Sequence, residues 1–318
     1  MAKQGKGNVM EGFFIFAISI LTLAFVYVIL CLALNIECGV AGMWDLGIVS
    51  YFGVGAYSYA IVVAPEAASY QHYLFGFEAN PIFGIALAIC LGGLSAYLIG
   101  LPSLRLRREY FLITTIAFSE VLRITFSNEN WLTNGVAGIY NIKQPLKSFF
   151  TPDNYIILLF IIFFCFAMIT YRIVNKLSYS TYGLSLKALR ENESLAKTAR
   201  IEPSKQYHSV YVFTGCMAGL SGALYVWLNT LIVPTQFTPN VTFFVWTALI
   251  IGGIGNNRGA FLGAIFFVLL LETLSFLNLS AELALVISSL RIALVGLALI
   301  LILRFLPNGL MSEKPRVL

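Results

Sequence analysis

Long apolar runs separated by short polar joints dominate the pattern of this chain. The runs cover 13–34, 47–64, 81–100, 110–127, 154–171, 208–232, 241–255, 260–279 and 284–305. Most approach the roughly 20 residues that a helix needs to cross a bilayer, whereas barrel strands would show shorter, alternating segments. The pattern therefore predicts membrane-spanning helices. The one long polar joint is 172–207.

Composition narrows the class of protein further. Of the 318 residues, 59% are hydrophobic and only 11% are charged, where a soluble domain carries about 25% charged residues. These values exclude a soluble enzyme, a disordered chain and a nucleic-acid binder. We expect an all-α polytopic membrane protein, a single domain over residues 1–318 with about 8–10 transmembrane helices.

The positions of the basic residues indicate an orientation. Most of the 20 lysines and arginines lie at the N-terminus, in the 101–109 joint, in the long joint, at Arg258 and in the C-terminal tail. The joints at 65–80 and 233–240 contain none. Cytoplasmic loops carry an excess of Lys and Arg, so we expect a multi-pass protein with both termini and the long joint in the cytoplasm.

With the N-terminus in the cytoplasm and the 65–80 joint outside, residues 1–80 must cross the membrane an odd number of times. Only two uninterrupted apolar runs precede residue 81. The segment 35–47 between these runs has glycines that free the backbone and two carboxylates, Glu37 and Asp45. We therefore expect a broken or re-entrant element near 36–50; an ordinary periplasmic loop with a miscounted span is the alternative. Broken backbone at membrane depth is tolerated only against protein or a water-filled path, and in transporters it marks the substrate route.

The long joint contains an amphipathic segment. Leu186, Leu189, Glu193 and Ala196 recur at helical spacing, and Pro203 prevents continuation. The sequence predicts a cytoplasmic helix near 184–200. Such a helix can lie on lipid, but mixed charge along Arg190–Glu193 favours docking into a protein groove.

Five blocks, in order, resemble one family. They are Gly42–Tyr57, Leu104–Glu120, Thr133–Gly138, Ala188–Ile201 and Ile251–Ala264. Together they resemble the membrane-spanning permease subunits of branched-chain (hydrophobic) amino acid ABC importers, LivM type. The resemblance extends over nearly the whole chain.

The resemblance implies a subunit that moves branched-chain or other hydrophobic amino acids, or related amides or urea, into a bacterial or archaeal cell through its inner membrane. It implies a second, LivH-like permease, two cytosolic ATPases and a periplasmic or lipid-anchored substrate-binding protein as partners, besides the lipid bilayer. The chain has no G-x-x-x-x-G-K-[S/T] loop, so we expect no cofactor on it and place ATP and Mg²⁺ on the ATPases. The residues implied to couple to the ATPases are Leu186, Leu189, Arg190, Glu191, Asn192, Glu193 and Ala196.

A substrate pathway is expected along the glycine-rich blocks. Its candidate residues are Gly42, Met43, Trp44, Asp45, Gly47, Glu120, Asn134, Gly135, Gly252 and Gly253. Asp45 stands where the family commonly has Ser, and a carboxylate at membrane depth is costly. Two roles stay open: contact with an amino group of the substrate, or capping of the following helix. Glu120 can pair with Arg123, although its family position favours the bundle interior.

Two other classes of protein fit the sequence less well. A stand-alone secondary transporter of small amino acids or amides would need an inverted repeat, which the glycine blocks at 42–57 and 252–263 suggest only faintly, and it leaves the 184–200 helix without a role. An intramembrane enzyme would need paired catalytic groups at depth. We expect no catalytic residue and no metal site, because His72 and His208 have no companion ligands.

Overall fold

The structure, a computed structural model, describes residues 2–67, 73–106, 108–275, 293, 296–297, 300–301, 304–306 and 308–313. Within these residues the fold is helical, and extended backbone pairs only in an isolated antiparallel bridge between Ile139 and Ile232. The prediction of an all-α polytopic membrane protein is confirmed. Most of the last predicted run, 284–305, lies outside the described residues.

Eight longer helices form the described part of the bundle. They are α1 (Ala2–Leu34), α2 (Ile48–Val63), α3 (Pro81–Ser103), α4 (Arg108–Asn128), α6 (Pro152–Ser178), α9 (Pro203–Asn229), α10 (Pro239–Gly252) and α11 (Asn257–Ser275). Shorter elements connect them: the π-helix η1 (Asn35–Val40), α5 (Asn130–Thr133), η2 (Gly135–Ala137), η3 (Lys147–Phe149), α7 (Thr181–Glu191), α8 (Glu193–Thr198) and η4 (Pro234–Gln236).

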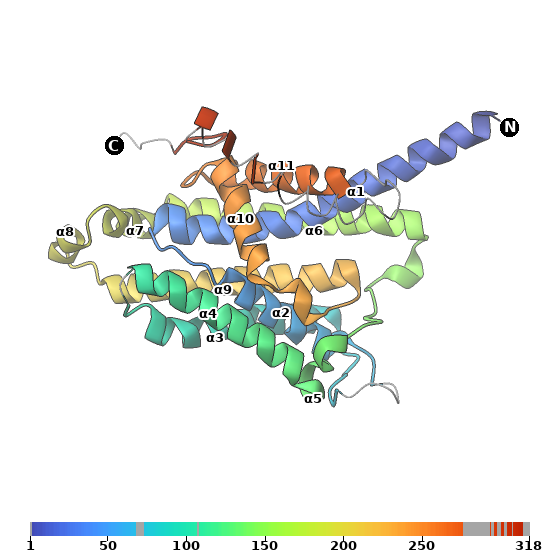
Figure 1. The fold of residues 1–318 in the computed structure, drawn as a ribbon, viewed down its shortest axis with the longest axis horizontal. Coiled ribbons are helices and arrows are strands. Elements are labelled where there is room, and N and C mark those ends of the chain that lie inside the picture. The colour runs from blue at the N-terminus through green and yellow to red at the C-terminus, as the bar shows by residue number, and fades with distance from the viewer. Residues whose placement is uncertain are drawn as a thin grey trace.

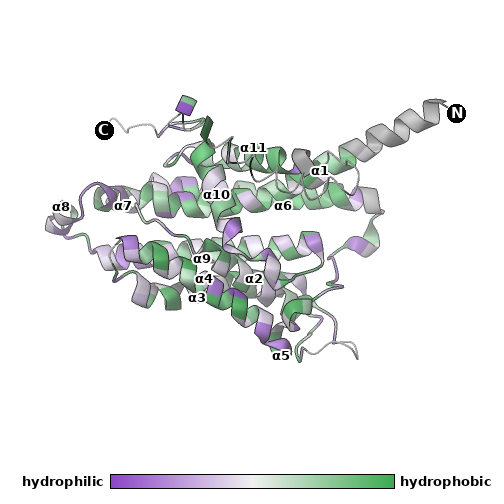
Figure 2. Cartoon of the chain, viewed as in Figure 1, coloured by the Kyte–Doolittle hydropathy of each residue, from purple (hydrophilic) through white to green (hydrophobic). Residues whose placement is uncertain are grey.

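Five stretches among the described residues are long and apolar enough to cross a membrane. They are Phe14–Val40, Pro81–Ser103, Glu109–Asn128, Asn154–Ser178 and Pro203–Asn229. The most apolar part of α9 is 67% buried, whereas that of α4 is 22% buried, so α9 lies centrally and α4 faces outward. Hydrophobic residues follow the length of the helices, and hydrophilic residues gather near α7 and near α5, at opposite ends (Figure 2).

The helices form two layers. In Figure 1, α1, α6 and α11 run side by side above α2, α3, α4 and α9, and α10 crosses between the layers. The contacts agree: α9 packs on α2 and α3 and also touches α1, while α10 reaches α1, α2, α4 and α11. The core therefore lies between the layers, around α9 and the end of α1.

Glycines bring the central helices into close contact. A methyl group at Gly219 of α9 would overlap the backbone of Ala88 on α3, and one at Gly55 of α2 would overlap Gly219 itself. A methyl at Gly263 of α11 would likewise meet the Gly252 backbone on α10. These contacts are the close packing that the small residues predict, since without Cβ atoms the backbones approach more closely.

The direction of α1 differs from the expected one. The guanidinium of Arg190 on α7 donates a hydrogen bond to the carbonyl of Gly39, so the C-terminal end of the first span lies beside the long joint. Phe14, 25 residues earlier, then lies about 40 Å away at 1.5 Å per residue. Figure 1 accordingly shows the N-terminus at the end opposite α7 and α8.

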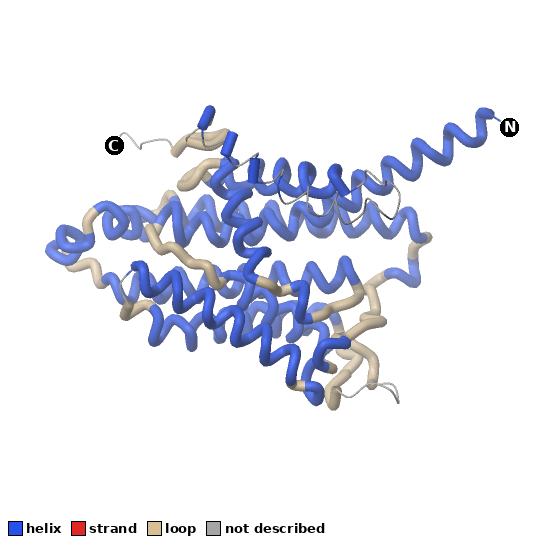
Figure 3. The backbone as a smooth tube through the Cα atoms, viewed as in Figure 1, coloured by secondary structure: helices blue, strands red, loops and turns tan. Residues whose placement is uncertain are grey.

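This direction removes the need for an extra crossing. α1 crosses towards the joint, residues 41–63 return, and α3 crosses towards the joint again (Figure 1). The parity argument was wrong because it assumed that the N-terminus lies on the side of the joint. The broken element is nevertheless present: helix geometry stops after η1 and resumes at Ile48, and Figure 3 shows the intervening stretch as a tan loop leading into the bundle.

The Gly219 contact generates a stability prediction. Gly219→Val places a branched side chain against the α3 backbone at Ala88 and Gly92, which cannot rotate away, so we expect a loss of about 1–3 kcal/mol of stability. Thermal unfolding of the purified protein in detergent measures it. Gly12→Val is the matched control, because nothing lies within 4 Å of a methyl at Gly12. Equal unfolding temperatures for the two variants would contradict the packing described.

Candidate functional site

The loop 41–47 is held by side chains that satisfy its backbone. The Asp45 carboxylate accepts the Gly47 N–H at 2.8 Å, in the turn that leads into α2. The Asp45 carbonyl accepts Trp246 Nε1–H at 2.8 Å, and the Thr115 hydroxyl accepts the Leu46 N–H at 3.1 Å. Helices α4 and α10 thereby replace the hydrogen bonds that a helix would supply at this depth.

The bond to Gly47 uses only one of the Asp45 carboxylate oxygens. The residue is fully buried, and Oδ2 has no hydrogen-bond partner among the described residues. Asp45 thus stabilises the turn before α2 rather than capping the helix itself, and contact with an amino group of the substrate stays a prediction.

A cavity of about 570 Å³ lies beside this loop. Gly42, Met43 and Trp44 line it together with Glu193 and Lys197 of α8. The rest of the lining comes from Leu104, Arg105, Leu106, Phe111, Pro203, Ser204 and Tyr207. Residues predicted for the substrate pathway and for ATPase coupling thus share one cavity wall.

Trp44 holds the outer part of the loop in place. Its ring stacks on Trp246 of α10 with centroids 5.2 Å apart and planes 17° apart, and 42% of the residue remains exposed. Gly42 has φ of +74°, and a methyl there would meet the Arg190 side chain. Substitution at Gly42 would therefore strain the backbone and disturb α7 as well.

The other predicted pathway residues lie elsewhere. Gly47 packs on the Thr115 backbone of α4. Glu120 leaves 40% of its side chain exposed and pairs with Arg123 at 2.5 Å, so the expectation that it faces the bundle interior is wrong. The pairing itself is confirmed. Its cause is the three-residue spacing, which puts both side chains on one outward face of α4.

Two further pairs occupy opposite ends of the bundle. Asn134 and Gly135 form a left-handed turn after α5, with φ of +61° and +59°, and the Asn134 amide donates to the Gly138 carbonyl at 2.8 Å. Gly252 packs on Gly259 of α11, and Gly253 (φ +109°) lies against the backbone of Met311. The ten residues therefore divide among the loop 41–47, a turn near α5, the α10–α11 turn and the outer face of α4, and only Gly42, Met43 and Trp44 line the cavity.

The coupling segment consists of two helices, not the single helix expected over 184–200. α7 begins after Ser180, whose hydroxyl accepts the Gly183 N–H at 3.2 Å, and it ends at Glu191. Asn192 is extended (φ −156°, ψ 102°), and its side chain accepts the Leu195 N–H at 3.0 Å to start α8. Asn favours capping over helix interiors, which is why the helix breaks there.

The predicted coupling residues point in two directions. Leu186, Leu189 and Ala196 are buried against the bundle, so their role is to seat α7 and α8 on it. Glu191, Asn192 and Glu193 face outward. Leu195, which is not among the predicted coupling residues, lies beside them and is 68% exposed. We call Glu191, Asn192, Glu193 and Leu195 the outer face of the joint.

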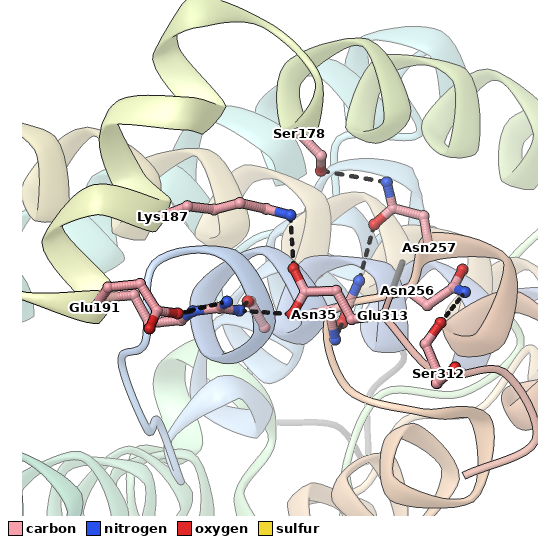
Figure 4. A network of polar contacts seen from close by, with 11 residues as sticks. Asn35, Ser178, Lys187, Glu191, Asn256, Asn257, Ser312 and Glu313 are labelled. Carbon is pink, nitrogen blue, oxygen red and sulfur yellow. Dashed lines mark hydrogen bonds and ion pairs between the residues drawn. The ribbon is translucent and has the colours of Figure 1, made fainter. Parts of the chain in front are cut away.

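Glu313 of the C-terminal segment ties α7 to the bundle. Its carboxylate pairs with Lys187 at 2.6 Å and with Arg190 at 3.1 Å (Figure 4). Arg190 also donates to Glu191 and to the carbonyl of Gly39. Burial lowers the pKa of Arg190, but Glu191 and Glu313 raise it above its ordinary value, so this side chain stays charged. We call this set the Glu313 clamp.

An amide network extends the clamp into the bundle. The Asn35 amide donates to Asn257 at 2.8 Å and accepts the Gly255 N–H at 2.8 Å (Figure 4). Asn257 in turn donates to Ser178 on α6 at 3.2 Å. The end of α1, the α10–α11 turn and α6 are therefore joined next to α7.

The C-terminal segment also bonds to the α10–α11 turn directly. Leu310 N–H donates to the Ile251 carbonyl at 2.8 Å, and Met311 N–H donates to the Gly252 carbonyl at 3.0 Å. These bonds use carbonyls that the end of α10 leaves free. Gly252 and Gly253 therefore anchor the segment that carries Glu313.

Residues 16–303 match the family model described as branched-chain amino acid transport system / permease component. The chain belongs to this family. It is 27% identical over 284 residues to the high-affinity branched-chain amino acid transport system permease protein LivM of Escherichia coli (strain K12), covering 82% of this chain and 64% of that relative. It is 30% identical to the probable LivM of Methanocaldococcus jannaschii, with 91% of each chain covered.

Similarity also extends to a LivH protein. The probable LivH of Methanocaldococcus jannaschii is 26% identical over 212 residues, 65% of this chain and 66% of that relative. No solved structure matches. This family member spans about 64% of the length of the LivM proteins from Escherichia coli and Salmonella typhimurium.

Three residues that the structure places at or near the site were not predicted from the sequence. Leu195 falls off the i, i+3 series used to find the helix, because the break at Asn192 resets the periodicity. Glu313 lies more than 100 residues from Lys187 in sequence, so no local pattern links the two. Glu37 was noted only as a polar residue, although it is 1% exposed.

The Glu313 clamp makes a testable prediction. Glu313→Gln removes the charge that two half-buried cations share, so we expect hydrogen exchange of the α7 amides to quicken about fivefold, equivalent to about 1 kcal/mol. Exchange measured by mass spectrometry in nanodiscs reports it. Glu202→Gln serves as control, since its pair with Lys205 is exposed on both sides. An equal effect of the two substitutions would refute the clamp.

Proposed function

We propose that the chain is a transmembrane permease subunit of an ATP-binding-cassette importer that moves branched-chain or other hydrophobic amino acids into the cytoplasm. Membership of the family supports this, as does one structural observation: the cavity beside the broken loop has α8 of the coupling joint in its wall. Movement of the joint would reshape the cavity directly. The chain performs no chemical step; ATP and Mg²⁺ belong to the partner ATPases.

We place the α7–α8 end of the bundle in the cytoplasm. The basic residues of the long joint support that side. The C-terminal segment that carries Glu313 is then cytoplasmic, and the N-terminal end of α1 lies on the other side. The turn with Asn134 and Gly135 lies near that opposite side, where a substrate-binding protein would deliver its ligand.

The outer face of the joint is the proposed docking site for the ATPases. It combines an exposed leucine with carboxylates from Glu191 and Glu193, a mixture suited to a protein groove. The buried side of the same helices carries Arg190 and the Glu313 clamp. A push on the outer face would therefore reach the end of α1 through Arg190.

A second, LivH-like permease is the proposed membrane partner. The similarity of this chain to a LivH protein supports a pairing of two related subunits around a pseudo-two-fold axis. A periplasmic or lipid-anchored binding protein and two ATPases would complete the importer.

Leu195→Asp tests the docking site. The new charge would be buried without a partner when an ATPase covers it, so we expect ATPase activity stimulated by the binding protein to fall at least tenfold in the assembled complex. Co-purification of the ATPases with the tagged chain is the second readout. Leu74→Asp is the matched control for co-purification of the ATPases, because it is an equally exposed leucine on the loop between α2 and α3, at the opposite end of the bundle.

Two results would contradict the proposal. Full stimulation and normal co-purification of the Leu195→Asp variant would refute the docking face. Uptake of L-leucine by the chain alone in proteoliposomes, without ATP, would instead establish a secondary transporter.

A further inference from the structure

A buried acidic cluster lies where η1, α2, α9 and the loop 41–47 meet. Glu37 of η1 accepts a hydrogen bond from the Thr214 hydroxyl on α9. One turn earlier on α9, Tyr211 bonds to the hydroxyl of Tyr51 on α2, and Asp45 lies in the loop just before that helix. Glu37 and Asp45 act electrostatically on each other and on both tyrosines, so the four side chains form one cluster.

Each carboxylate leaves one oxygen without a hydrogen bond. Glu37 Oε2 and Asp45 Oδ2 are fully buried and unpartnered among the described residues. The nearby Thr115 hydroxyl donates to the Leu112 carbonyl at 3.1 Å. No lysine, arginine or histidine in the described part of the chain forms an ion pair with either carboxylate.

An arrangement of this kind is costly while both carboxylates are charged. A buried carboxylate without a partner loses its hydration, and a second one beside it adds like-charge repulsion. A proton on one carboxyl relieves the repulsion, whereas a bound positive group would also give both orphan oxygens the hydrogen bonds they lack. Within a membrane protein, ionisable groups at depth are candidates for a functional site.

The chemistry of the cluster selects an ammonium group over a metal ion. The described residues contain no group of three or more His, Cys, Asp or Glu side chains that could hold a metal. A primary ammonium has three N–H donors, which match two carboxylate oxygens and a tyrosine hydroxyl. Sodium is the remaining cation, and the experiment below separates it.

Two residues of the cavity wall contact residues of the cluster. Phe111 lines the cavity and packs edge-on against Tyr211, with ring centroids 5.7 Å apart. Met43 also lines the cavity, and its N–H donates to the Glu37 carbonyl at 2.8 Å. The neighbouring wall includes Leu104 and Leu106.

We propose that Glu37 and Asp45 bind the primary ammonium group of the transported ligand, while its apolar body lies toward Phe111 and Met43. The proposal rests on the proposed function and names the substrate class of that site: an amphiphilic ammonium compound rather than a neutral amide or urea. Phe111 and Met43 form the inner wall that must move for the ligand to pass between cluster and cavity.

The test uses the assembled importer in proteoliposomes, with L-leucine on its binding protein. Glu37→Gln and Asp45→Asn keep the side-chain shapes and remove the charges, so each is expected to lower leucine uptake at least tenfold. Stimulated ATP hydrolysis should change less than twofold, because the outer face is untouched. Tyr59→Phe is the matched control: it removes another unpartnered buried oxygen on α2, outside the cluster.

Unchanged uptake in both variants would overturn the proposal. Where a variant fails to fold, the native complex decides: isoamylammonium should inhibit leucine uptake, and 4-methylpentanoate at equal concentration should not. The reverse pattern, or uptake that disappears when choline replaces sodium, would overturn the ammonium assignment. Absence of any stimulated ATP hydrolysis in the native complex would refute the proposed function, and the inference with it.

Discussion

The constraint on which this structure depends is the hydrogen bonding of a non-helical stretch inside a membrane bundle. Residues 41–47 have no helix to satisfy their backbone, and lipid offers no substitute. Asp45, Thr115 and Trp246 supply the missing partners from three separate segments. The break therefore fixes how α2, α4 and α10 sit relative to the end of α1. It also leaves part of the cavity wall, at Gly42, Met43 and Trp44, formed by loop, and a loop can change shape at smaller cost than a packed helix.

A second set of contacts determines what can move this wall. The Glu313 clamp connects α7 to the carbonyl of Gly39, immediately before the loop, and Gly42 within the loop packs on Arg190. The amide network around Asn35 and Asn257 fastens the same end of α1 to α6 and to the α10–α11 turn. A displacement of α7 is thus transmitted through direct bonds to the loop, while the rest of α1 is held by packing. This is the kind of contiguous physical connection that coupling between two sites requires.

The sequence predicted the parts of the fold that depend on local pattern. Apolar runs located the spans, and the glycine-rich segment after Leu34 located the break. It could not predict contacts between residues distant in the chain, such as Glu313 with Lys187, or the inward position of Leu186 and Leu189. An amphipathic pattern identifies an apolar face without saying what covers it. The predicted side of the N-terminus was wrong because Lys3 and Lys6 were counted as cytoplasmic charges. In the fold, the N-terminal end of α1 lies opposite α7 and α8 (Figure 1).

The position of Glu37 illustrates how burial changes the meaning of a residue. In the sequence it is one polar residue at the end of an apolar run; in the fold the π-helix turns it towards Thr214 and brings it near Asp45. A π-helix shifts side chains relative to α-helical spacing, and such turns frequently occur at functional sites. Had α1 continued as an α-helix through residues 35–40, Glu37 would occupy a different angular position around its axis. The acidic cluster therefore depends on the same local departure from regular helix that ends the first span and begins the broken loop.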